Sequence, residues 1–365
     1  MSLTFEDFTT SNLSSNLSSK EMTTSNLSST EMTNTAIAHW TTAYAHAIAI
    51  VYILFGVLGV ASNGIVFFSV VTRPKLRTID NFLLANVALI QLLYFATSHP
   101  ISIWAALSYG VWRDDDVVCQ ISAYFNTTLL PVWWIAHAVL SVEKCIKTMY
   151  DFEKKRTMIV QMSLLVIFVS WSFCAGIATA PLVGVGRYKV LRTRLTCGPN
   201  YDNPIDAIVV YSRTVLVVCW IITIICYVII STIINRYGNK YLALRSTGSQ
   251  VEVAAARQRR RALTKLLSSS TQMGTTVLIS IGLYTIAFIL PAGYNILLHD
   301  DPDYEYGSTD FHIYATQLFI LNLIFVVNPL IYSLPTKQLR NHLVEITKKF
   351  LCCRRGNDPR PKDAS

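Results

Sequence analysis

Residues 117–142, VVCQISAYFNTTLLPVWWIAHAVLSV, contain no aspartate, glutamate, lysine or arginine. A helix of about 20 predominantly apolar residues is long enough to cross the hydrocarbon core of a bilayer, which is roughly 30 Å thick. Charged residues return directly after this stretch, at Glu143 and Lys144. The stretch therefore predicts a membrane-spanning helix whose charged border begins at Glu143.

Other stretches of the chain have the same character. The predicted spans are seven in all, at residues 45–71, 81–107, 117–142, 158–183, 207–234, 273–298 and 313–333. Arg213 is the only lysine, arginine, aspartate or glutamate inside them, in a chain that is 52% hydrophobic and 15% charged. We therefore predict an all-α membrane protein, with a seven-transmembrane helix bundle over residues 44–335.

Lysine and arginine are divided unevenly among the segments that join the spans. Alternate segments, counted from the N-terminal tail, carry 6 of these residues, and the remaining segments carry 24. Because basic residues are retained on the cytoplasmic side, we predict a multi-pass protein of the plasma membrane with its N-terminus outside. The net charge of +9 then faces anionic membrane lipid, so the basic run at 257–261 implies no nucleic acid.

Residues 1–43 form a segment of low complexity, in which TTSNLSS occurs at 9–15 and again at 23–29. Such a composition cannot bury enough apolar surface to fold, so we predict a disordered extracellular tail. It lacks the basic start and apolar core of a signal peptide, and we expect the first span to direct translocation. Sequons for N-glycosylation occur at Asn12, Asn16 and Asn26.

The C-terminal segment begins at Pro335, where the last span cannot continue. In residues 336–351 apolar side chains recur at helical spacing: Leu339, Leu343, Ile346 and Phe350. This pattern predicts a short amphipathic eighth helix that lies on the membrane surface. The cytoplasmic tail, 352–365, opens with Cys352 and Cys353, which are predicted sites of acylation, although two reduced surface thiols are the alternative.

Two other cysteines lie where the compartment is oxidising, Cys119 at the start of the third span and Cys197 in the second outer loop. A disulfide between them would tie that loop over the bundle. The remaining cysteines are most simply packing residues: Cys145, Cys174, Cys219 and Cys226. The sequence contains no metal-ligand cluster, nucleophile motif or phosphate loop, so we predict no metal, no cofactor and no enzyme activity.

The order of landmarks along residues 45–353 resembles that of rhodopsin-like (class A) G-protein-coupled receptors. The most specific landmark is Asn328-Pro329-Leu330-Ile331-Tyr332, which matches the NPxxY motif of that family. Further landmarks are Asn63, Trp112, Trp171, Pro181 and Pro291. The sequence resembles a divergent member of the family. The resemblance implies two partners, a heterotrimeric G protein and an extracellular ligand, which is either a small molecule or a peptide.

The resemblance also implies a ligand-binding site. Its residues would be Asn126, Tyr211, Ser212, Tyr294, Asn295 and Asn322. The second outer loop resembles that of opsins, but their retinal lysine falls at Asn322, which has no amine for a Schiff base. Asn126 stands where aminergic receptors place an aspartate, so a protonated amine would lack its counter-ion. We expect a polar, aromatic and uncharged pocket.

Polar side chains within the spans are expected to meet inside the bundle, and the resemblance implies an interior network of Asn63, Gln91 and Asn328. In the family an aspartate at the position of Gln91 binds sodium. Gln91 carries no charge, so we expect no inhibition of activation by sodium.

Glu143-Lys144-Cys145 occupies the position of the family's Asp-Arg-Tyr motif. Lysine keeps the positive charge of arginine but loses its planar fork of donors, and the usual acidic partner in the sixth span falls at Thr271. The switch residues implied by the resemblance are Glu143, Lys144, Cys145, Tyr227, Asn328, Pro329 and Tyr332. We predict a receptor with weakened or constitutive coupling; the alternative is a ligand-binding decoy or scaffold that does not activate G proteins.

Overall fold

The computed structural model describes most of the bundle. The described residues are 46–107, 117–149, 152–191, 196–199, 207–247, 249–254, 257–258, 282–283, 285–286, 308–333, 340–341 and 344–345. The predicted tails, 1–43 and 352–365, lie outside them, as does most of the sixth span. Residues 340–341 and 344–345 of the predicted eighth helix are helical and exposed.

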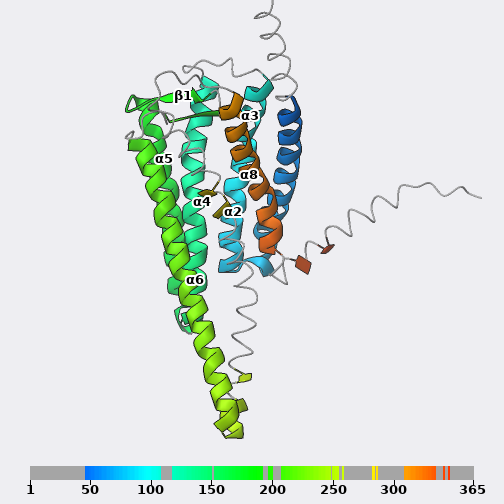
Figure 1. Ribbon diagram of the computed structural model, residues 1–365, viewed down its shortest axis with the longest axis vertical. Coiled ribbons are helices and arrows are strands. Elements are labelled where there is room, and N and C mark those ends of the chain that lie inside the picture. The colour runs from blue at the N-terminus through cyan, green and yellow to red at the C-terminus, as the bar shows by residue number, and fades with distance from the viewer. Residues whose placement is uncertain are drawn as a thin grey trace, which may run out of the picture.

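Long apolar helices occupy the predicted spans of the described chain. Five are long and apolar enough to cross a membrane, His46–Thr72, Ile79–Leu107, Val117–Met149, Val160–Val183 and Ala207–Ile233, and a shorter apolar helix covers Ala315–Pro329. They correspond to the first five spans and the seventh, and Figure 1 shows them running side by side.

The helical span Ile79–Leu107 is interrupted at Thr97 and so consists of two consecutive helices. Helix α2 (Ile79–Ala96) ends at Thr97, and α3 (Ser98–Leu107) follows directly. Pro100 has no N–H to donate to the preceding turn, which favours a break there. The hydroxyl and N–H of Thr97 both donate to the carbonyl of Leu93, at 2.6 and 3.0 Å.

Two helices extend past the predicted ends of their spans. Helix α4 (Val117–Met149) passes the predicted end at residue 142, and α6 (Ala207–Thr247) passes residue 234. The prediction located the end of each apolar run, whereas backbone hydrogen bonds continue through charged residues. At 1.5 Å per residue, the 41 residues of α6 span about 60 Å, and its lower end projects beyond the other helices in Figure 1.

The segment between α5 (Phe152–Thr179) and α6 contains a small sheet, which the all-α expectation did not include. Strands β1 (Tyr188–Leu191) and β2 (Thr196–Pro199) pair antiparallel, with Val190 opposite Cys197. Cys197 forms a disulfide with Cys119 of α4, with a Cα–Cα separation of 5.3 Å. The bond joins the hairpin to the N-terminal end of α4.

Helix α4 lies at the centre of the bundle, because it contacts α2, α5, α6 and both strands. Most of its apolar stretch is buried, whereas little of His46–Thr72 and of Val160–Val183 is buried, as expected for faces that meet lipid. In the core the Trp133 ring lies 5.2 Å from Phe325 of α8 (Ser308–Ser333) and 4.4 Å from His137.

Candidate functional site

The C-terminal part of α4 carries buried charges. Glu143 and Lys144 are only 1% and 6% exposed. Residues three and four apart on a helix lie on the same face, so Lys147 is within reach of both. Charges that leave water require partners, and the structure supplies them from two helices.

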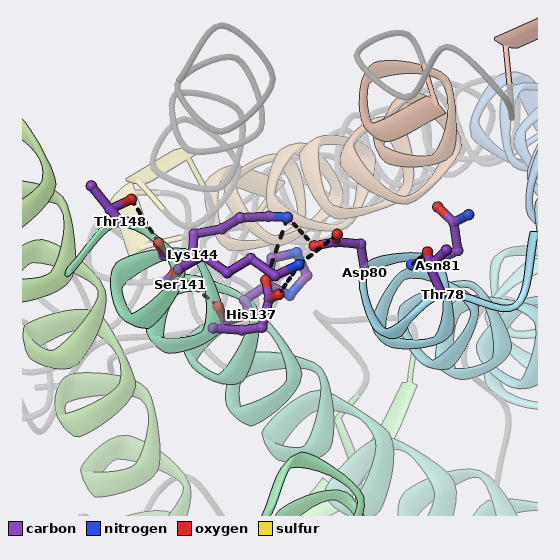
Figure 2. Close-up of polar contacts among 9 residues, drawn as sticks. Thr78, Asp80, Asn81, His137, Ser141, Lys144 and Thr148 are labelled. Atoms are coloured by element: carbon purple, nitrogen blue, oxygen red, sulfur yellow. Dashed lines mark hydrogen bonds and ion pairs between the residues drawn. The ribbon is translucent and has the colours of Figure 1, made fainter. Parts of the chain in front are cut away.

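Two acids and two lysines form a cluster, here called the charge cluster: Asp80, Glu143, Lys144 and Lys147. The Lys144 ammonium pairs with Asp80 Oδ1 and lies 3.4 Å from Glu143 Oε2. The Lys147 ammonium lies 2.6 Å from Asp80 Oδ2 and also pairs with Glu143 Oε1. Each lysine therefore contacts both acids, and Figure 2 shows Asp80 reaching across from α2.

Sequence reasoning missed two members of the charge cluster, Lys147 and, on a second helix, Asp80. Asp80 lies in the first turn of α2, where the Thr78 hydroxyl accepts the N–H of Asn81 at 3.4 Å. The Asn81 amide donates to the carbonyl of Leu76 at 2.8 Å, which fixes the entry to the helix. One sequence signal could have indicated Asp80, because it is the only acidic residue in the basic segment 72–80. The helix that its side chain contacts depends on packing, which the sequence does not show.

Cys145 and Tyr227, also predicted switch residues, lie beside the charge cluster and not within it. Cys145 is 4% exposed and packs with Cys226 and Ile230 of α6, against which Tyr227 also packs. Helix α4 therefore meets α6 through an apolar contact at this end, and meets α2 through charges.

The motif in α8 is partly described. Asn328 and Pro329 are buried within the helix. Tyr332 belongs to the same helix, but its side chain is outside the described part.

The three interior polar residues are all buried, with Asn63 and Gln91 at 0% exposure and Asn328 at 1%. Asn63 donates to the carbonyls of Gly59 at 2.9 Å and Phe325 at 3.1 Å, which links the first helix to α8. Neither amide atom of Gln91 has a hydrogen-bond partner among the residues described. A polar interior is therefore present among the described helices.

The predicted ligand residues bond to separate elements. Asn126 donates to the Thr196 hydroxyl of β2 at 2.9 Å. The Tyr211 hydroxyl donates to Cys174 Sγ of α5 at 3.0 Å, and Asn322, which is fully buried, donates to the Leu318 carbonyl at 2.9 Å.

Within the described part of the chain, these hydrogen bonds do not join Asn126, Tyr211 and Asn322 to one another. Ser212 is partly buried on α6. Tyr294 and Asn295 lie in the sixth span, outside the described residues.

The described helices are joined by buried polar contacts, and they carry a disulfide-tethered hairpin at one end of α4 and the charge cluster near the other. The family model described as "7 transmembrane receptor (rhodopsin family)" matches residues 62–332. The chain belongs to this family. It is a G-protein-coupled receptor and a multi-pass membrane protein, and its family is a receptor class rather than an enzyme class.

Opsins are among its relatives. Rhodopsin of Lethenteron camtschaticum is 27% identical over 324 residues, which cover 86% of this chain and 82% of that protein. A violet-sensitive opsin of Xenopus laevis is 24% identical, with 79% of this chain and 78% of that protein covered. The crystal structure of squid rhodopsin matches with a TM-score of 0.64 at 16% identity, covering 86% of this chain and 87% of that chain. This similarity supports the seven-helix fold.

Proposed function

We propose that this receptor passes an extracellular ligand signal to heterotrimeric G proteins through the cytoplasmic end of α4, with weakened coupling. The observation that carries the proposal is the state of Lys144. It occupies the position of the family's arginine, is buried, and pairs with carboxylates from two helices. A lysine held in this way is poorly available to an incoming protein.

The chemistry of lysine supports the same conclusion. An ammonium is a compact point charge, whereas guanidinium presents five donors in a planar fork. Lys144 would make fewer directed hydrogen bonds to a G protein than arginine would, even after release from Asp80 and Glu143. Constitutive coupling remains the alternative for this site, because the family's acid in the sixth span is replaced by Thr271.

For the ligand, we propose a small molecule or a peptide that binds without a covalent bond. Asn322 has no amine, so it cannot form the Schiff base that a lysine forms with an aldehyde. Asn126 is uncharged and already bonded to the hairpin, so it offers no counter-ion to a protonated amine. Gln91 likewise offers no charge for sodium.

We propose further that the receptor lies in the plasma membrane with its N-terminus outside, glycosylated at Asn12, Asn16 and Asn26. Acylation of Cys352 and Cys353 would hold the end of the amphipathic helix against membrane lipid. The distribution of basic residues along the sequence supports this orientation.

The test is Lys144→Arg in the full receptor, with G-protein dissociation measured in cells across a complete panel of G proteins, with and without a broad ligand panel. We expect basal or ligand-driven dissociation to rise, because the guanidinium restores the fork of donors. Lys75→Arg is the matched control, because Lys75 is an exposed cytoplasmic lysine outside the charge cluster. Unchanged output for Lys144→Arg across the whole panel, at equal surface expression, would contradict the proposal.

A further inference from the structure

We propose that Asp80 is a latch that restrains the cytoplasmic end of α4 in the inactive receptor. It acts as a positioning residue: it holds Lys144 and Lys147 toward α2 and has to release them before Lys144 can meet a G protein. The coupling half of this inference rests on the proposed function, whereas the restraint itself does not.

Asp80 can act as the latch because its carboxylate contacts two lysines of another helix. Its two carboxylate oxygens engage different lysines, Oδ1 with Lys144 and Oδ2 with Lys147 at 2.6 Å. Glu143 contacts the same lysines, but it belongs to their own helix and cannot join α4 to another one. Within the charge cluster, Asp80 alone connects two helices.

Burial makes the restraint strong. The side chains of Glu143, Lys144 and Lys147 are 1%, 7% and 14% exposed, and that of Asp80 is 31% exposed. The negative charges of the two acids balance the positive charges of the two lysines. Removing one charge from a buried group of this kind leaves its partner uncompensated, which is strongly unfavourable. Without the carboxylate of Asp80, the charge cluster would carry one excess positive charge. An uncompensated ammonium is more stable in water than in the protein interior, so Lys144 or Lys147 would move toward solvent.

The position of Asp80 also identifies an acid that can restrain Lys144 in place of the acid missing from the sixth span. Thr271 supplies no charge at the position where the family places an acid in the sixth span, so the expected restraint on Lys144 is missing there. An acid on α2 can supply it instead, because the entry of α2 is fixed by Thr78, Asn81 and Leu76. The restraint would then act between α2 and α4.

The main test is Asp80→Asn in the full-length receptor. Asparagine keeps the shape and is tolerated in a first helical turn, but it removes the charge. We expect basal G-protein dissociation to rise about fivefold or more, within the usual range of coupling energies. Asp80→Glu, which keeps the charge, should stay near the wild type, and Glu252→Gln, an exposed acid, is the control for charge loss.

A second readout requires no G protein. Cys145 and Cys226 are buried between α4 and α6, so release of α4 should expose them. In purified receptor, Asp80→Asn should increase the rate at which a maleimide labels these two thiols, resolved by mass spectrometry, and Glu252→Gln should not. If Asp80→Asn folds poorly, Asp80→Ser provides the same test, because it removes the same charge and both pairs with the lysines, and serine is well tolerated at the start of a helix.

The outcomes separate the two proposals. A folded Asp80→Asn variant with wild-type labelling and wild-type basal dissociation overturns the latch, and a response to Lys144→Arg in the same assay leaves the proposed function standing. Faster labelling without signalling by any variant, Lys144→Arg included, supports the restraint and overturns coupling through Lys144. Equal responses to Asp80→Asn and Glu252→Gln also overturn the latch.

Discussion

Gly59 in the first helix shows how a single residue determines the approach of two helices. A Cβ placed on it would lie 2.2 Å from Cε2 of Phe95, a buried residue of α2. The carbonyl of Gly59 also accepts the Asn63 amide. The absence of a side chain therefore allows the Phe95 ring to lie directly against the first helix, next to a polar link to α8.

Gly59→Ala should destabilise the receptor by about 1–3 kcal/mol, because an inserted methyl group in a packed contact forces the ring or the helix to shift. The measurement is thermal or denaturant unfolding of purified receptor. Gly64→Ala is the matched control, since its Cβ would be 4.0 Å from the nearest atom, Phe68 Cδ2. Equal stability of the two variants would show that Phe95 does not require the glycine.

At the scale of elements, a short helical segment at residues 250–254 begins shortly after α6. The Ser249 hydroxyl and N–H both donate to Glu252 Oε2, at 2.9 and 3.1 Å, and the N–H of Glu252 approaches the Ser249 oxygen at 3.4 Å. This reciprocal arrangement is a capping box. The hydrogen bonds from Ser249 lower the pKa of Glu252 below its ordinary value.

Ser249→Ala should loosen this helix start, and acid should loosen it in the wild type. Because the pKa of Glu252 is lower in the folded helix than in the unfolded chain, its stabilising effect is present above the unfolded pKa and is lost as pH falls through the folded value. Hydrogen exchange of amides 250–254 in the intact receptor measures both effects. Gln250→Ala is the control, and exchange that is insensitive to Ser249→Ala would contradict the cap.

For the whole molecule, the question is which end faces outward. The 24 to 6 division of basic residues implies an external N-terminus, and the disulfide between Cys119 and Cys197 lies at the end of the bundle that this orientation exposes to an oxidising compartment. The charge cluster lies near the opposite end of α4.

Replacing Asn12, Asn16 and Asn26 together by glutamine should abolish the mass shift that a glycosidase causes in receptor from mammalian cells, because these sequons lie outside in the proposed orientation. Asn126→Gln is the control: Asn126 begins a sequon too, but it lies within α4 beside buried Thr127 and Thr128. A glycosidase-sensitive shift that persists in the triple variant would contradict the assignment of sites.

The sequence by itself determined the family resemblance and the position of the described spans, and it predicts the orientation. Hydropathy and charge are properties of contiguous residues, so the apolar run at 117–142 and the basic border after it could be read directly. Helix ends were less certain, as α4 and α6 show, because a helix does not end where its apolar run ends. The rhodopsin-family match over residues 62–332 confirms the family that the landmarks indicated.

Only the tertiary structure decided which side chains meet. Asp80 and Lys144 are 64 residues apart in sequence, and their pairing depends on how α2 and α4 are rotated about their axes. The same holds for Asn126, which bonds to the hairpin, and for Tyr211, which turns to α5. Helix rotation and depth arise from the packing of the whole bundle, and a local pattern of residues does not specify them.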